Sequence, residues 1–336
     1  MTNAVIFGCA GPQLLPDEAA FFRATRPLGF ILFARNVVDP AQLRRLTADL
    51  RASIGQPEAP ILIDQEGGRV RRLRPPHWRE IPAPGVFGAL AERDLKASER
   101  AVALNHRLMA AELKDVGITV DCAPLLDIRF PGAHDVVGDR SFGNDPALIT
   151  KLGRIAAEAL LDGGVMPVIK HIPGHGRAMV DSHHDLPRVT EGHASLAASD
   201  FRPFIALRDL PWGMTAHLVY EAIDPDHPAT LSQKVIGEVI RGEIGFDGLL
   251  LTDDLSMKAL KGSFTERAAG SLAAGCDVVL HCNGDMAEMR QVAAGLSPLS
   301  AVAKARYERG QARLRAVAGS AIDPVETRAE LELLIG

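Results

Sequence analysis

The sequence lacks any long uninterrupted hydrophobic run, and no stretch approaches the roughly 18 apolar residues that a membrane-spanning helix requires. Residues 1–13 contain no basic residue ahead of a short apolar stretch, so we expect no secretory signal. We therefore expect a cytoplasmic protein that does not associate with membranes.

Cysteine and excess positive charge are also scarce. The four cysteines form no CxxC pair and lie mostly inside apolar runs, which predicts buried free thiols rather than disulfides. They are Cys9, Cys122, Cys276 and Cys282. A formal net charge of −5 leaves no basic excess, so we expect no nucleic-acid partner.

The sequence does contain a regular series of short apolar runs separated by helical patterns. Continuous apolar runs are typical of strands that are buried on both faces of a parallel sheet. We expect strands at Val5–Cys9, Gly29–Phe33, Ile61–Asp64, Thr119–Ala123, Met166–Lys170, Gly213–His217, Gly248–Thr252 and Asp277–His281. Amphipathic helices are expected between them, as at Ala97–Val116, Pro146–Asp162 and Leu231–Ile244. Eight such units predict an α/β fold, a single (β/α)8 TIM-type barrel, with a doubly wound open sheet as the alternative.

The domain organisation is simple. The sequence shows no linker, internal repeat or low-complexity segment, and prolines at 75–76 and 82–84 mark a long loop after the third strand. The last part of the chain predicts two helices, at Leu299–Val317 and Thr327–Leu334. We expect one catalytic domain over residues 1–336, a barrel with C-terminal helices, and a monomer.

Charged and polar residues follow several of the predicted strands. Asp64, Lys170–His171, His217 and Asp253–Asp254 each stand at the end of an apolar run. Active sites of α/β barrels gather at the carboxyl ends of the strands. These residues are therefore candidates for a shared site.

A histidine-rich segment follows the fifth predicted strand. His171, His175, His183 and His184 lie close together among glycines, in a pattern typical of a loop. Clustered histidines can bind a metal, but the spacing is neither HExxH nor HxH, and Lys170 would place a positive charge beside the ion. The alternative is an Asp–His pair, in which Asp181 orients His183 for acid/base chemistry. These two side chains could also merely form hydrogen bonds within a turn.

Two further segments carry carboxylates at strand ends. Asp253 is placed to act as a fixed nucleophile or base. Adjacent strand residues face opposite ways, so we expect Asp254 to be structural and to cap the following helix. After the third strand, Asp64 could accept two sugar hydroxyls and Arg72 could donate to others, across a turn permitted by Gly67 and Gly68.

Taken together, these segments resemble the signatures of family 3 glycoside hydrolases. The matching motifs are residues 64–70, 170–176 with 181–183, and 252–257. More narrowly, they are similar to those of the family's single-domain bacterial β-N-acetylglucosaminidases, which act in peptidoglycan recycling. The order and spacing of the motifs agree over residues 5–290. Ile172 stands where phenylalanine is usual, and residues 177–180 fill a variable part of the loop.

The resemblance implies a role for each matching residue. Asp253 is the catalytic nucleophile, His183 is the acid/base, and Asp181 is the partner of His183. Sugar-hydroxyl contacts are implied for Asp64, Arg72, Arg140, Lys170 and His171. The family fold is a (β/α)8 barrel that uses no metal and no organic cofactor.

The implied reaction is a retaining hydrolysis of terminal β-linked N-acetylglucosamine from muropeptide fragments, through a glycosyl-enzyme on Asp253. A histidine acid/base removes a negative charge from the site, which leaves open a phosphorylase in which phosphate replaces water. A broader β-glycosidase of the same family is a further alternative. A metal-dependent amidohydrolase and an inactive sugar-binding module are the alternatives from other classes.

Overall fold

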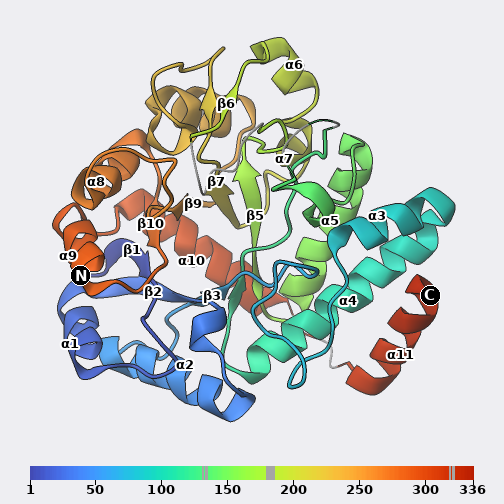
Figure 1. The fold of residues 1–336 in the computed structure, drawn as a ribbon, viewed down its shortest axis with the longest axis horizontal. Coiled ribbons are helices and arrows are strands. Elements are labelled where there is room, and N and C mark those ends of the chain that lie inside the picture. The colour runs from blue at the N-terminus through green and yellow to red at the C-terminus, as the bar shows by residue number, and fades with distance from the viewer. Residues whose placement is uncertain (131, 133–134, 179–185, 318, 320–321) are drawn as a thin grey trace.

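Eight parallel strands close into a barrel that is surrounded by helices (Figure 1). The computed structural model describes residues 1–130, 132, 135–178, 186–317, 319 and 322–336. The barrel strands are β1 (Asn3–Phe7), β2 (Pro27–Leu32), β3 (Ile61–Ile63), β4 (Val120–Asp121), β5 (Met166–Ile172), β7 (Trp212–Thr215), β9 (Leu249–Asp254) and β10 (Val278–His281). Each pairs in parallel with the next, and β10 pairs with β1. The predicted fold class and all eight predicted strand positions are confirmed.

Helices follow the strands in sequence and form the outer layer (Figure 1). They are α1 (Pro16–Thr25), α2 (Pro40–Ile54), α3 (Pro84–Arg93), α4 (Leu95–Asp115), α5 (Pro146–Asp162), α6 (His193–Ala198), α7 (Arg202–Ala206), α8 (Phe264–Ala274) and α9 (Met286–Ala294). The local sequence explains where several begin. In α2 and α5, Asp39 and Asp145 accept hydrogen bonds from backbone amides of the first turn, and proline follows at the first helical position.

The helix predicted at Leu231–Ile244 begins later than expected. A 3₁₀ turn covers Ala229–Leu231, and a π-helix then covers Val235–Glu243. The Ser232 hydroxyl accepts a hydrogen bond from the Val235 amide at 3.0 Å, so the side chain caps the helix at this point. A short strand pair outside the barrel, β6 (Arg188–Val189) and β8 (Val219–Tyr220), precedes this region.

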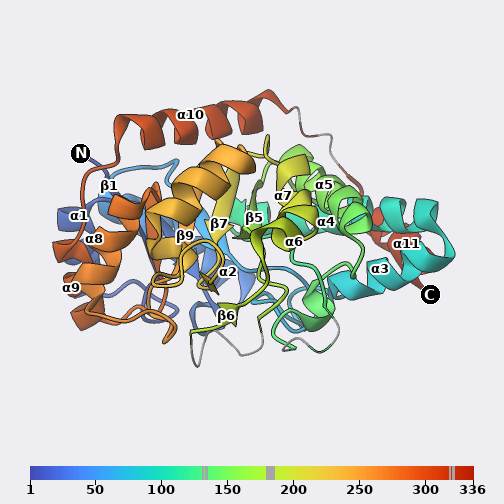
Figure 2. The same cartoon turned by 90° about the horizontal axis from the view of Figure 1, so that it is seen from above.

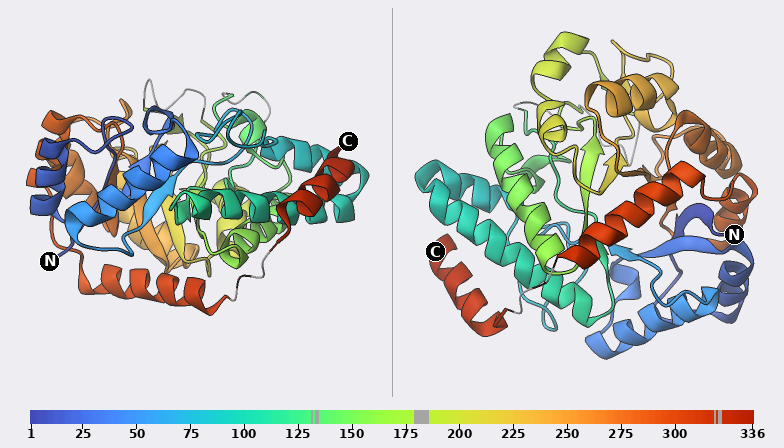
Figure 3. Two further views of the ribbon diagram at one scale, coloured as in Figure 1. Left: turned by 90° about the horizontal axis from the view of Figure 1, so that it is seen from below. Right: turned by 180° about the vertical axis from the view of Figure 1, so that it is seen from behind.

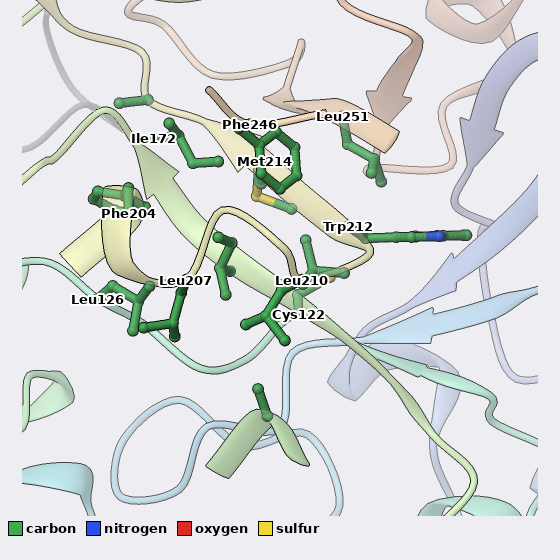
Figure 4. Close-up of a cluster of buried hydrophobic side chains, with 14 of the residues drawn as sticks. Cys122, Leu126, Ile172, Phe204, Leu207, Leu210, Trp212, Met214, Phe246 and Leu251 are labelled. Carbon is green, nitrogen blue, oxygen red and sulfur yellow. The ribbon is translucent and has the colours of Figure 1, made fainter. Parts of the chain in front are cut away.

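The apolar core fills the barrel interior and the layer between strands and helices. Figure 4 shows one part of it, where side chains from several elements pack together. The labelled side chains are Cys122, Leu126, Ile172, Phe204, Leu207, Leu210, Trp212, Met214, Phe246 and Leu251. All four cysteines are buried and free, as the sequence predicted.

Two C-terminal helices complete the structure, α10 (Ala301–Ala316) and α11 (Pro324–Ile335). Helix α10 lies across one end of the barrel, whereas α11 packs against α4 (Figures 2 and 3). Gly310 allows α10 to lie close to the start of β7, because a Cβ atom at this position would lie 3.0 Å from Nε1 of Trp212, the first residue of that strand. Arg306 pairs with Asp247 and Asp277 at 2.8 and 2.9 Å. Helix α10 therefore closes the amino ends of the strands, and the carboxyl ends remain for a site.

None of the described helices is both long enough and apolar enough to cross a bilayer.

Candidate active site

One pocket at the carboxyl end of the barrel contains all six described residues that the sequence singled out for chemistry or sugar binding. Asp64 directly follows β3, Lys170 and His171 lie near the end of β5, and Asp253 lies near the end of β9. The lining is Asp64, Glu66, Val70, Arg72, Val136, Arg140, Lys170, His171, His175, Met214, Asp253 and Met257. The barrel thus brings together residues that are almost 200 positions apart, at the end where such sites are expected.

Lys170 forms the centre of a charged network in this pocket. Its ammonium nitrogen lies 2.9 Å from Asp64 Oδ1 and 2.6 Å from Glu66 Oε1. The Lys170 side chain is only 3% exposed, so these carboxylates replace the water that would otherwise solvate the charge.

Two arginines extend the network at its ends. Arg72 lies 3.2 Å from Asp64 Oδ2. Arg140 makes a bidentate pair with Glu66, with both nitrogen–oxygen distances at 2.8 Å. Three cations therefore share two carboxylates, and the network presents an excess of hydrogen-bond donors to the pocket.

The pKa values in this network follow from its charges. Burial alone would raise the pKa of Glu66, but Arg140 and Lys170 more than offset this and lower it to about 2. Asp64 behaves in the same way, because burial is outweighed by Lys170 and Arg72 and its pKa falls well below the usual range. Burial would lower the pKa of Lys170, but the carboxylates of Asp64 and Glu66 raise it above its ordinary value. All three groups are therefore charged at neutral pH.

Asp253 occupies the same pocket as an ionised carboxylate. Its Oδ1 accepts a hydrogen bond from the Asp254 amide at 2.8 Å, and its Oδ2 lies 4.0 Å from Nε2 of His171. Burial raises the pKa of Asp253, but His217 and then His171 lower it, and the net pKa is below the ordinary value. Such a group can act as a nucleophile without first losing a proton.

Asp254 faces away from the pocket, as strand geometry predicted, but its expected helix-capping role is wrong. Its carboxylate accepts hydrogen bonds from the amide and hydroxyl of Ser256 and from the amide of Cys282 after β10. Helix α8 starts only at Phe264 and is capped by Ser263. Asp254 therefore stabilises the turn after β9 and connects it to the neighbouring strand.

His217, at the end of a predicted strand, is buried beneath this turn. Its Nε2 lies 3.0 Å from the carbonyl oxygen of Asp254, and its Nδ1 lies 2.7 Å from the hydroxyl of Thr230. Burial lowers the pKa of His217. A neutral ring can donate to the carbonyl and accept from the hydroxyl, so His217 holds the backbone that follows Asp253.

Three residues to which the sequence patterns gave no role help to form the site, namely Glu66, Asp127 and His175. Asp127 Oδ2 lies 2.7 Å from Nδ1 of His171, and its Oδ1 accepts a hydrogen bond from the His175 amide at 2.6 Å. Burial, followed by the proximity of His171, lowers the pKa of His175 to about 4. Asp127 lies six positions after the end of β4 and directly follows Leu125 and Leu126, so a polar residue after this apolar run is the signal that could have identified it.

The predicted acid/base pair cannot be located in the same way. Asp181 and His183 lie outside the described residues. The described geometry therefore covers Asp253 and the residues that the sequence predicted to contact sugar.

The clustered histidines do not form a metal site in the described structure. Within the described part of the chain, no group of three or more histidine, cysteine, aspartate or glutamate side chains is arranged to hold a metal ion. His171 and His175 instead have ring centroids 5.3 Å apart and share Asp127 as a partner.

Comparison with known proteins agrees with this geometry. Residues 23–317 match the model of the glycosyl hydrolase family 3 N-terminal domain. The beta-hexosaminidase of Alkalilimnicola ehrlichii is 42% identical over 290 residues, which cover 84% of this chain and 81% of the relative. The beta-hexosaminidase of Bordetella avium is 38% identical over 283 residues, covering 83% of this chain and 80% of the relative.

Solved structures give the same result in three dimensions. The crystal structure of NagZ from Neisseria gonorrhoeae, in complex with N-trifluoroacetyl-D-glucosamine, superposes with a TM-score of 0.87. The two chains are 31% identical, and the match covers 99% of this chain and 97% of that one. The barrel, the pocket and the sequence relationships together identify the chain as a glycoside hydrolase that belongs to glycosyl hydrolase family 3.

Proposed function

We propose that this enzyme is a retaining β-N-acetylhexosaminidase that removes terminal β-linked N-acetylglucosamine from muropeptide fragments. The main supporting observation is the ionised Asp253 carboxylate, which lies at the end of β9 beside a dense set of sugar-binding groups. The names of its relatives, beta-hexosaminidase and NagZ, agree with this substrate class.

The charged network supplies the groups that bind the sugar. Donors on Lys170, Arg72 and Arg140 can contact hydroxyl oxygens, while the carboxylate of Asp64 can accept hydroxyl protons. His171 contributes its Nε2 from the side nearest Asp253. Because these groups already hold one another in place, little reorganisation is needed when the sugar binds.

The reaction follows a double displacement. Asp253 attacks the anomeric carbon while His183 protonates the leaving oxygen, and a glycosyl-enzyme forms. His183, oriented by Asp181, then takes a proton from the water that releases the sugar. The residues of this chain provide the nucleophile and the proton transfers, and no metal or organic cofactor takes part.

We infer that the barrel and its C-terminal helices act as one catalytic domain over residues 1–336. The enzyme works as a cytoplasmic monomer on a small carbohydrate substrate. Sedimentation of the purified chain would test the monomer directly.

A panel of p-nitrophenyl glycosides, assayed with and without phosphate, tests the function. We expect cleavage of the β-N-acetylglucosaminide well above that of the glucoside, and free N-acetylglucosamine as the product. N-acetylglucosamine 1-phosphate in the phosphate-containing samples would instead show a phosphorylase. Comparable rates on several sugars would show a broader β-glycosidase.

The p-nitrophenyl panel tests the sugar but not whether the sugar is released from a muropeptide, so the natural leaving group needs a separate experiment. Muropeptide fragments and chitobiose should be compared as competing substrates in one mixture, with products identified by mass spectrometry. The proposal predicts faster release of N-acetylglucosamine from the muropeptide. Equal or faster cleavage of chitobiose would contradict this part of it.

A further inference from the structure

Asp127 is a buried carboxylate that lies behind the pocket and does not line it. It follows β4, and its side chain has no exposed surface. Its backbone is fixed by the hydroxyl of Ser141, which donates to the Asp127 carbonyl oxygen at 2.6 Å. The two carboxylate oxygens have different partners, and this difference determines what the residue can do.

Oδ1 of Asp127 accepts two backbone hydrogen bonds. The amide of His175 donates at 2.6 Å and the amide of His171 at 3.3 Å. Backbone amides can only donate, so the atom in this position has to be an acceptor. The orientation of the carboxylate is therefore fixed by the main chain.

Oδ2 of Asp127 consequently faces the imidazole of His171, at 2.7 Å from Nδ1. Burial raises the pKa of Asp127, but His171 lowers it by more, and the net pKa is below the ordinary value. The group is therefore ionised at neutral pH. An ionised carboxylate only accepts, so Nδ1 of His171 has to carry a proton. The other ring nitrogen, Nε2, is then directed toward Asp253, 4.0 Å away.

We propose that Asp127 is a positioning residue that keeps the proton of His171 on Nδ1 and thereby fixes the polarity and direction of Nε2 in the sugar pocket. The same carboxylate holds the backbone at His175. The kinetic consequence rests on the proposed function, because it assumes that Nε2 contacts the bound sugar. The position of the proton does not depend on that assumption.

The asparagine variant separates this role from simple packing. In Asp127→Asn the amide oxygen has to take the place of Oδ1, because two backbone amides donate to that position. The new NH2 group then faces Nδ1 of His171 as a donor. The ring can accept this donor only with a lone pair on Nδ1, so the almost isosteric change removes the proton from Nδ1 and leaves Nε2 as the nitrogen that carries a proton.

Nitrogen-15 NMR of histidine-labelled protein measures this directly, with the His171→Asn spectrum used for assignment. We expect a proton on Nδ1 of His171 in the wild-type protein and its absence from Nδ1 in Asp127→Asn. A wild-type Nδ1 without a proton would overturn the proposal, even if the variant failed to fold. Retention of the Nδ1 proton in a folded Asp127→Asn variant would also overturn it.

Kinetics provide the second measurement. Loss of a buried hydrogen bond to a charged group predicts a roughly ten- to a hundred-fold lower kcat/KM for Asp127→Asn. Asp224 provides a matched control, because this buried carboxylate also accepts two backbone amides, at 3.1 and 3.2 Å, but lies outside the pocket lining. Asp224→Asn should retain nearly full activity. Equal losses in the two variants would reduce Asp127 to a structural role.

The outcomes also distinguish this proposal from the proposed function. If the wild-type enzyme cleaved no N-acetylglucosaminide, the proposed function would fail, and the NMR result would still decide the role of Asp127. If the wild-type enzyme cleaved it and the Nδ1 proton were absent, only the role of Asp127 would fail.

Discussion

The ammonium nitrogen of Lys170 lies 2.6 Å from Oε1 of Glu66, and both side chains are almost completely buried. Glu66 also holds Arg140 through two hydrogen bonds, so one carboxylate positions two cations of the proposed sugar site. A sugar would therefore meet donors that are already fixed in direction.

Lys170→Met should destabilise the fold strongly. Removing the ammonium group leaves two buried carboxylates without their shared partner, and breaking a buried ion pair from one side typically costs about 3–5 kcal/mol. The free energy of unfolding in urea measures the effect. The control is Lys151→Met, which removes an exposed pair with Glu99 on the surface and should cost at most about 1 kcal/mol. Similar losses in both variants would contradict the account.

Acid should destabilise the enzyme through the same carboxylates. The pKa of Glu66 is lowered from 4.5 to about 2 in the folded state, so the folded protein binds this proton less readily than the unfolded chain does. The stabilisation is complete above about pH 4.5 and is lost as the pH falls toward 2. Urea unfolding between pH 5 and 2 should show a shallower decline for Glu66→Gln. An unchanged slope would show that Glu66 contributes nothing to acid sensitivity.

The adjacent aspartates of β9 should differ sharply in function. Asp253→Asn removes the proposed nucleophile and should lower kcat by at least about a thousand-fold. Asp254→Asn keeps an acceptor for the amides of Ser256 and Cys282, and its NH2 group can donate to the Ser256 hydroxyl. It should retain most of the activity in steady-state assays. A comparable loss in the two variants would contradict the assignment.

The acid/base role of His183 should appear as a dependence on the leaving group. His183→Ala should slow natural substrates by about 10²–10⁴-fold, because their leaving oxygen needs a proton. Dinitrophenyl glycosides need no such help and should be spared in the glycosylation step, with Asp181→Ala showing a milder form of the same pattern. Pre-steady-state rates test this. Equal losses on both substrate types, with deglycosylation not limiting, would exclude His183 as the general acid.

Much of the fold was predictable from the sequence because strand burial leaves a direct pattern. Runs such as Leu249–Leu251 are apolar at consecutive positions, since both faces of the barrel wall are covered. The residue at which the helix predicted from Leu231 begins was harder to predict from the sequence. It depends on the side chain of Ser232, which caps a later turn.

The site was predictable wherever a residue stands at a strand end. Asp64, Lys170 and Asp253 could be identified in that way and line one pocket. Glu66 could not, because its importance comes from Arg140, which lies 74 positions away in the chain. The capping role expected for Asp254 was wrong for a related reason, since the sequence does not show that α8 begins only ten positions after it, at Phe264.

The most direct test of the central claim is to trap the glycosyl-enzyme. A 5-fluoro-N-acetylglucosaminyl donor with a good leaving group should accumulate the intermediate, and peptide mass spectrometry should locate the added sugar. The account predicts the label within residues 249–257, on Asp253. A label on Asp64 or Glu66 would contradict it.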